Sequence, residues 1–136
     1  LNGARRMSTP TRVALDTSAL MMPVELDVRL FDELDRLVDA YEPTTPQAVV
    51  EELRRLAEKG GTEGTAANVG HDLATERCLI VDTEESYADD ALVELAREGA
   101  VEYVVTNDRP LCDRVLEERV PVIALRGRNK LAITQP

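Results

Sequence analysis

The chain has 136 residues, and 43% of them are hydrophobic, which suits one domain with a single core. Only 3% are aromatic and none is tryptophan, so leucine, valine, isoleucine and alanine must fill that core. The 26 acidic residues outnumber the 16 basic ones and give a net charge of −10, which argues against a protein whose whole surface binds nucleic acid.

The start of the chain is polar and lacks the apolar core of a signal peptide. We therefore expect a flexible leader over residues 1–11, with Met7 as a candidate natural start, and a single domain over residues 12–136. No apolar run approaches the ~18 residues of a membrane-spanning helix, which predicts a cytoplasmic protein without a membrane partner. Cys78 and Cys112 lie in or near apolar segments, which favours two reduced thiols over a disulfide.

The first predicted strand covers residues 12–15 and ends abruptly in Asp16-Thr17-Ser18. The Met-Met-Pro sequence at residues 21–23 predicts a turn. Residues 26–41 carry apolar side chains every three or four positions, which predicts a helix. Its apolar stripe fits either the core or, in part, the interface of a homodimer.

Residues 42–45 should form a short extended link, because Pro43 disfavours a regular central strand. A helix should follow with Thr45 as its N-cap and Pro46 as its first residue, and end at Gly60-Gly61. The remaining pattern predicts helices over 62–76, 88–98 and 110–118, strands over 77–82, 102–106 and 120–125, and a possible edge strand over 131–134.

This alternation of strands with helices of ten to fifteen residues is typical of βαβ units. It predicts the α/β class, with a mostly parallel sheet and helices on both of its faces. In such a sheet, ligands bind beyond the carboxyl ends of the strands. The polar residues that follow each strand are therefore the candidates for a functional site.

Several acidic residues should meet at that edge. Asp16 follows the first strand and Asp108 follows the strand over 102–106. Asp89 and Asp90 begin one helix, and the pair Glu51-Glu52 lies in the first turns of another. Taken singly, each acid could be a helix cap or a solvated surface group. Two strands that both end in aspartate favour a shared cavity.

A cluster of four acids repels itself and raises its own pKa values unless a cation neutralises it. Hard oxygen ligands of this kind favour one or two ions of Mg²⁺ or Mn²⁺. Ions held in this way suit the hydrolysis of phosphodiester bonds. The sequence therefore predicts a metal-dependent hydrolase.

Four motifs together resemble the PIN-domain ribonucleases: Asp16-Thr17-Ser18 after a strand, Glu52 in VVEEL, Tyr87-Ala88-Asp89-Asp90, and Thr106-Asn107-Asp108 after VV. The resemblance covers the chain from about Arg12 to Thr134. It implies a three-layer α/β/α sandwich around a mostly parallel sheet of four or five strands. It also implies a metal-dependent endoribonuclease that hydrolyses RNA.

The same resemblance assigns roles to residues of this chain. Asp16, Glu52, Asp89 and Asp108 become the catalytic, metal-binding acids. Asp90 becomes an additional metal ligand. Ser18, Thr106 and Asn107 become supporting residues that orient ligands or water.

Within the family, YADD and the basic LRGRNKL segment look most like the archaeal proteins that process ribosomal RNA. Toxin members of toxin–antitoxin pairs share the same acids and are close competitors. The resemblance therefore implies RNA as a partner, together with a ribosomal assembly protein or an antitoxin. A third alternative is a non-catalytic assembly factor that binds RNA or protein.

Arg126, Arg128 and Lys130 form the one concentrated basic strip of the sequence. They could contact RNA phosphates beside the acidic cavity, or they could belong to a solvated turn. Tyr87 could stack on a base or pack the loop that carries it.

Overall fold

A computed structural model describes residues 10–136 of the chain. Pro10 and Thr11 are the part of the predicted leader that falls in this range, and Thr11 already belongs to the first strand. The rest of the leader, including the candidate start at Met7, lies outside the described residues.

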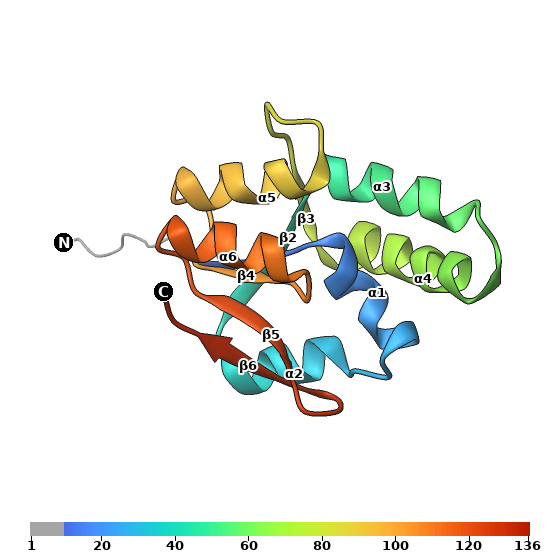
Figure 1. Cartoon of the computed structure of the whole chain (residues 1–136), viewed down its shortest axis with the longest axis horizontal. Helices are drawn as coiled ribbons and strands as arrows, with labels where there is room; N and C mark the ends of the chain where they lie inside the picture. The colour runs from blue at the N-terminus through green and yellow to red at the C-terminus, as the bar shows by residue number, and fades with distance from the viewer. Residues whose placement is uncertain (1–9) are drawn as a thin grey trace.

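One sheet of six strands forms the centre of the molecule, in the order β3-β2-β1-β4-β5-β6 (Figure 1). Neighbouring strands from β3 to β5 pair in parallel, and β5 and β6 pair antiparallel. The strands are β1 Thr11–Leu15, β2 Tyr41–Pro46, β3 Leu79–Val81, β4 Tyr103–Val105, β5 Val122–Arg126 and β6 Lys130–Thr134. The predicted α/β class with a mostly parallel sheet is confirmed, but the sheet has six strands instead of the four or five that were expected.

Six helices surround the sheet within the described residues. They are α1 Thr17–Glu25, α2 Leu30–Leu37, α3 Gln47–Ala57, α4 Gly61–Arg77, α5 Ala88–Arg97 and α6 Arg109–Glu117. Helix α4 packs extensively against both α3 and α1, while α5 packs against α6 (Figure 1).

The order of the strands places a crevice between β1 and β4. These two strands are neighbours, and the chain leaves β1 into α1 but leaves β4 into α6. Since the helices that follow them diverge, this pair of strands is the point at which the strand order of the sheet reverses. Ligands of open α/β sheets bind at such points.

The segment from Tyr41 to Pro46 corrects the prediction of a short link over residues 42–45. It is strand β2, which pairs with β1 through residues 41–44 and with β3 only from Thr44 onward. Pro43 therefore lies where one side of β2 has no strand partner, and a residue without an N–H group is tolerated there. Thr45 is likewise not an N-cap, because its hydroxyl donates to the Leu15 carbonyl at 2.8 Å and α3 begins at Gln47.

The predicted turn at residues 21–23 is also wrong. Helix α1 continues through Pro23 to Glu25, because Asp16 caps its start and its residues 19–22 are buried. The helix predicted over residues 26–41 is shorter and covers only α2, after a link in which Asp27 has a φ of 53°.

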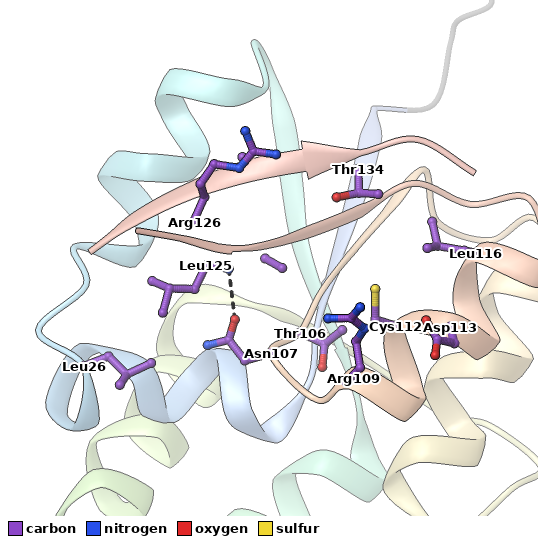
Figure 2. A pocket seen from close by; sticks show the side chains of 12 residues that line it. Leu26, Thr106, Asn107, Arg109, Cys112, Asp113, Leu116, Leu125, Arg126 and Thr134 are labelled. Carbon is purple, nitrogen blue, oxygen red and sulfur yellow. Dashed lines mark hydrogen bonds between the residues drawn. The ribbon is translucent and has the colours of Figure 1, made fainter. Parts of the chain in front are cut away.

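The β5–β6 hairpin forms one end of the sheet and faces the start of α6 (Figure 2). It confirms the predicted edge strand near the end of the chain. Helix α2 covers this edge. The Leu131 N–H donates to Glu33 at 2.9 Å, and Arg36 donates to the Leu131 carbonyl at 2.8 Å. These two side chains satisfy backbone groups that would otherwise invite another strand.

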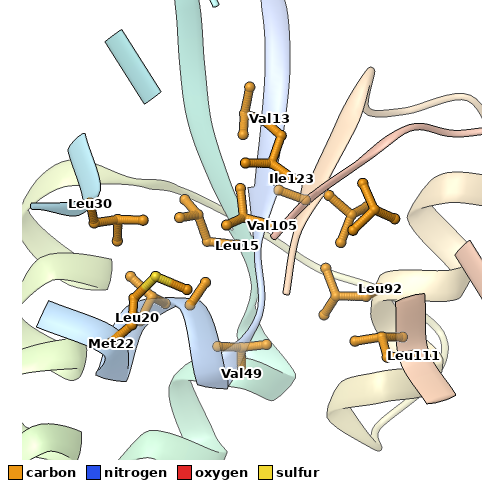
Figure 3. Close-up of a cluster of buried hydrophobic side chains, with 14 of the residues drawn as sticks. Val13, Leu15, Leu20, Met22, Leu30, Val49, Leu92, Val105, Leu111 and Ile123 are labelled. Carbon is orange, nitrogen blue, oxygen red and sulfur yellow. The ribbon is translucent and has the colours of Figure 1, made fainter. Parts of the chain in front are cut away.

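The core fills both sides of the sheet with aliphatic side chains (Figure 3). Leu20, Met22 and Leu30 lie on one side of the central strands, whereas Leu92 and Leu111 lie on the other. The apolar stripe of α2 belongs to this core, because Leu30, Phe31 and Leu34 are buried. Two packed faces hold the carboxyl ends of β1 and β4 in fixed positions.

Candidate functional site

The four predicted acids converge on one cavity of about 270 Å³, which we call the acid cavity. Asp16 follows β1 and Asp108 follows β4, whereas Glu52 comes from α3 and Asp89 from α5. The residues lining the cavity are Asp16, Thr17, Ser18, Met21, Glu25, Glu52, Glu63, Tyr87, Asp89 and Asp108. The acid cavity thus lies at the crevice between β1 and β4.

Asp16 is the most deeply held acid, with 3% of its surface exposed. Its carboxylate accepts hydrogen bonds from the Ala19 N–H at 2.7 Å, from the Ser18 hydroxyl at 2.8 Å and from the Thr106 hydroxyl. The bond from Ala19 makes Asp16 the N-cap of α1. These donors fix the orientation of the carboxylate.

Ser18 and Thr106 tie Asp16 to the end of β4. The Asp108 N–H donates to the Thr106 hydroxyl at 3.0 Å, and the Asn107 N–H donates to the Ser18 hydroxyl at 3.1 Å. Each hydroxyl in turn donates to the Asp16 carboxylate. The two strand ends are therefore one hydrogen-bonded unit.

Asp108 is both a helix cap and a residue of the acid cavity. Its Oδ1 accepts the Leu111 N–H at 3.0 Å as the N-cap of α6. The same side chain lines the acid cavity. The two interpretations of this acid, cap and site residue, are therefore compatible.

The structure separates the two pairs of adjacent acids. Glu52 lines the acid cavity and accepts a hydrogen bond from the Thr17 hydroxyl, while Glu51 binds Gln47 and Arg54 outside it. In the second pair, Asp89-Asp90, it is Asp89 that lines the acid cavity.

The carboxylate of Asp90 instead accepts a hydrogen bond from Arg114 at 2.9 Å. Asp90 is not among the lining residues of the acid cavity. The geometry therefore favours Glu52 and Asp89 as the members of each pair that belong to the site.

The electrostatics of the acid cavity disfavour the ionisation of two of its acids, Asp16 and Asp89. Burial raises the pKa of Asp16 to about 7, although its three hydrogen bonds oppose the shift. Burial also raises the pKa of Asp89, and the nearby carboxylates of Asp108 and Glu52 raise it further. The described residues that line the cavity include no lysine, arginine or histidine. A bound cation would relieve this repulsion.

Two further acids of the cavity, Glu25 and Glu63, were not predicted. Glu25 lies at the end of α1, on the same helical face as Ser18 and Met21. Recognising α1 as a helix would have revealed this spacing. Glu63 lies in the first turn of α4. Tyr87 lines the rim of the cavity with 61% of its surface exposed.

The donor set fits a hard divalent cation by its chemistry, because every charged side chain in the lining is a carboxylate. Across residues 10–136, no three histidine, cysteine or acidic side chains stand close enough to hold one ion as they are placed. Binding would therefore require these side chains to move closer together.

A second cavity of about 580 Å³ lies on the other side of the β4 end, and we call it the flanking cavity (Figure 2). Its lining residues are Leu26, Thr106, Asn107, Arg109, Cys112, Asp113, Leu116, Ala124, Leu125, Arg126, Ala132 and Thr134. The Asn107 side chain faces this cavity and accepts the Leu125 N–H at 3.0 Å. Of the supporting residues predicted, only Ser18 and Thr106 contact Asp16 through their side chains.

The predicted basic strip is divided by the structure. Arg126 lines the flanking cavity, Arg128 lies in the exposed turn of the β5–β6 hairpin, and the Lys130 Nζ lies 3.6 Å from Glu33. None of the three lines the acid cavity. Arg126 is therefore the member of the strip best placed to act with the acids.

Comparisons with known proteins show the family and the fold of the chain. A family model described as a PIN-like domain matches residues 13–128. Ribonuclease VapC4 of Methanocaldococcus jannaschii is 28% identical to the chain over 127 residues, which cover 90% of this chain and 95% of that protein.

Two solved structures share the fold. The PIN domain endonuclease Utp24 superposes with a TM-score of 0.75 at 24% identity, with 93% of each chain covered. VapBC2 from Rickettsia felis, bound to a DNA fragment from their promoter, superposes with a TM-score of 0.64 at 13% identity, covering 85% of this chain and 100% of that one. Separately, no helix within residues 10–136 is long and apolar enough to cross a membrane.

Proposed function

This chain belongs to the PIN-like domain family, and from that membership we propose that it is a metal-dependent endoribonuclease acting at the acid cavity. One observation carries the proposal. Asp16, Glu52, Asp89 and Asp108 come from four separate elements and line one cavity at the reversal point of the sheet. Packing alone does not require one buried and three half-buried acids at that position.

In the proposed site, Asp16, Glu52, Asp89 and Asp108 would hold one or two ions of Mg²⁺ or Mn²⁺. When bound, such ions would act as Lewis acids that polarise the phosphate and lower the pKa of a bound water molecule. Ser18 and Thr106 keep the Asp16 carboxylate in one orientation through their hydroxyl groups. Tyr87 offers an exposed ring at the rim on which a base can stack.

The first biological role we propose is the processing of ribosomal RNA, with a ribosomal assembly protein as partner. The structural likeness to Utp24 shows the shared fold only. The toxin-type alternative, with an antitoxin partner, is supported by the sequence match to Ribonuclease VapC4 over nearly the full length of both proteins. A cytoplasmic location and a homodimer stay predictions under either role.

The test of the proposal is cleavage of a mixed panel of structured and single-stranded RNAs in Mg²⁺, in Mn²⁺ and in chelator. The Asp16→Asn variant should lose cleavage at least about 100-fold while it remains folded. The matched pair Glu52→Gln and Glu51→Gln has the same charge change on adjacent residues. Only Glu52→Gln should reduce the rate strongly, because Glu51 binds Gln47 and Arg54 outside the acid cavity.

The outcomes separate the alternatives. Cleavage that needs both the metal and Asp16 would establish the nuclease. Equal activity of wild type and Asp16→Asn on a proven substrate would refute the assigned roles. A folded chain that binds RNA but cuts none of the panel would favour the non-catalytic assembly factor.

Sequencing of RNA 5′ ends from cells that express the wild type or Asp16→Asn would distinguish the two catalytic roles. New ends confined to precursor ribosomal RNA support the processing role. New ends in mature RNAs, together with arrested growth that depends on Asp16, support the toxin role.

A further inference from the structure

We propose that the flanking cavity binds an unpaired nucleotide of the RNA, next to the phosphate held at the acid cavity. This inference rests on the proposed function and adds a binding site for the nucleotide next to the cut. It is carried by the position, the charge and the lining of the flanking cavity.

The two cavities are joined by three consecutive residues. Thr106 and Asn107 line the flanking cavity, and Asp108 lines the acid cavity. Because successive Cα atoms are about 3.8 Å apart, the two sites lie within the reach of adjoining groups of one RNA strand. Thr106 also donates to Asp16, so its side chain links the two cavities directly.

The charges of the two cavities are opposite. The acid cavity is lined by six carboxylates, whereas Arg109 and Arg126 line the flanking cavity against one acid, Asp113. RNA presents a phosphate at every step of its backbone, and arginine binds phosphate through two parallel N–H groups. The protein has a net charge of −10, so most of its surface repels RNA phosphates. Arg109 and Arg126 provide positive charge beside the acid cavity, where the next phosphate of the RNA strand can bind.

The rest of the lining suits a base. Leu26, Leu116 and Leu125 provide apolar walls, and Leu26 is 40% exposed. The Asn107 oxygen accepts the Leu125 N–H, which fixes the amide with its nitrogen on the side of Leu26 (Figure 2). That nitrogen is a hydrogen-bond donor for a base or ribose oxygen. The volume of about 580 Å³ lies in the range of small-molecule sites.

A nucleotide can enter this cavity only when its base is unpaired and unstacked. Sequence-tolerant recognition of single strands combines phosphate contacts with apolar surfaces for bases, and the flanking cavity offers both. A base within a duplex is covered on both faces by its neighbours and cannot insert. The substrate should therefore be single-stranded at the nucleotide next to the cut.

The test measures binding of a fluorescent ten-nucleotide single-stranded RNA, and of the same sequence annealed to its complement, in Mg²⁺ buffer. All proteins carry Asp16→Asn so that the RNA stays intact. Added variants are Arg109→Gln and Ala132→Leu, which change the charge and the volume of the flanking cavity separately. The matched control is Arg119→Gln, an exposed arginine just beyond the other end of α6.

We expect single-stranded RNA to bind more tightly than the duplex. Arg109→Gln should weaken the single strand about fivefold or more and reduce the salt slope of log K by about 0.7, as for one lost phosphate contact. Ala132→Leu should weaken it similarly with an unchanged slope, because it removes space rather than charge. Arg119→Gln should change the affinity less than about twofold.

The inference is overturned if Arg109→Gln and Ala132→Leu both bind like Arg119→Gln, which would leave a protein segment as the occupant of the flanking cavity. It is also overturned if the duplex binds as well as the single strand. Cleavage by the chain without these substitutions is measured separately. Loss of binding in the cavity variants without any cleavage would support the nucleotide site and refute the nuclease alone.

Discussion

Asp16 is under two opposing influences. Three groups donate hydrogen bonds to its carboxylate, yet burial dominates and raises its pKa from 3.8 to about 7. The ionised form therefore destabilises the folded chain when no cation is bound. The residue is retained in a position that stability alone would not choose, as is common for active-site groups.

This leads to a prediction about stability and pH in chelator. Because the folded pKa lies above the unfolded one, the wild type gains stability as the pH falls from about 7 toward 4. Asp16→Asn does not titrate and remains a good N-cap. We expect the variant to be more stable than the wild type by on the order of 2 kcal/mol at pH 8, a difference that shrinks toward pH 4.

Urea denaturation at several pH values measures this difference, and Glu51→Gln serves as the control for the loss of a carboxylate outside the acid cavity. A variant less stable than the wild type at pH 8 would contradict the burial cost. Asparagine keeps one oxygen that can accept from the Ala19 N–H and the Ser18 hydroxyl, and the Thr106 oxygen can accept from the new amide.

At the residue scale, the core of the site is predictable from the sequence because its acids occupy recognisable places. Asp16 and Asp108 end strands, and Asp89 begins a helix, so the order of strands and helices along the chain assigns each of them to one edge of the sheet. Glu25 cannot be assigned in this way, because the Met-Met-Pro sequence of its helix indicates a turn. From the sequence, the choice of Glu52 over Glu51 depends on the family resemblance alone.

At the element scale, the packing of α2 on β6 depends on Glu33. Arg36 and the Leu131 N–H donate to its carboxylate, and Lys130 lies nearby, which together lower its pKa from 4.5 to about 2. A lowered pKa stabilises the folded chain above about pH 4.5, and this stabilisation is lost as the pH falls toward 2.

We predict that Glu33→Gln lowers the free energy of unfolding by about 1 kcal/mol at pH 7 and by progressively less below pH 4. The control is Asp32→Asn on the same helix, whose ion pair with Arg29 is exposed and should contribute less than about 0.5 kcal/mol. Thermal unfolding at pH 7 and pH 3 tests the pair. Equal losses for both variants would show that the contact with β6 contributes nothing.

The contact between α1 and α4 requires a glycine at position 70. A Cβ atom there would lie 2.9 Å from the Leu20 carbonyl oxygen and 3.1 Å from Leu53 Cδ2. We expect Gly70→Ala to destabilise the chain by about 2 kcal/mol, despite the higher helix propensity of alanine. Asp16 is the N-cap of α1, so a displacement of α1 would also move this carboxylate. The cleavage rate should therefore fall as well.

Thr65→Ala on the exposed face of the same helix is the control, and its stability should rise slightly. Chemical denaturation and the cleavage rate are measured for both variants. A stable, fully active Gly70→Ala chain would show that α1 and α4 can separate without moving the site.

Helix α1 and strand β2 were not predicted, and the physical reason is the same for both. Pro23 and Pro43 usually mark breaks, but here tertiary context overrides that local preference. Burial of residues 19–22 keeps α1 helical through Pro23, and the incomplete pairing of β2 tolerates Pro43. Neither circumstance can be inferred from the local sequence. Of the remaining elements, the helix predicted over residues 26–41 covers only α2, and the others were predicted because their hydrophobic pattern or composition agreed with the fold.

At the scale of the whole molecule, the charge is distributed unevenly. Six of the 26 acids line the acid cavity, so a divalent cation should bind the folded chain far better than the unfolded one. We predict that Mn²⁺ at about tenfold excess over its dissociation constant raises the melting temperature of the wild type by about 5 °C.

Asp89→Asn should lose most of this increase, because it removes one carboxylate from the cavity. Potassium chloride at matched ionic strength controls for general screening of the −10 charge. An equal increase in wild type and variant, or an equal increase with potassium chloride, would contradict specific binding at the acid cavity.

The double role of Asp16 and Asp108 as caps has an evolutionary consequence. Selection for folding alone would preserve a cap at both positions, since each satisfies the N-terminus of a helix, but at position 16 asparagine would serve without the cost of a buried charge. A descendant that had lost its chemistry could therefore keep Asp108 and still resemble an enzyme. Glu52 and Asp89 cap no helix, so mutational drift would erase them first. Among relatives, the presence of Glu52 and Asp89 is therefore better evidence of retained catalytic activity than the presence of the capping aspartate Asp108.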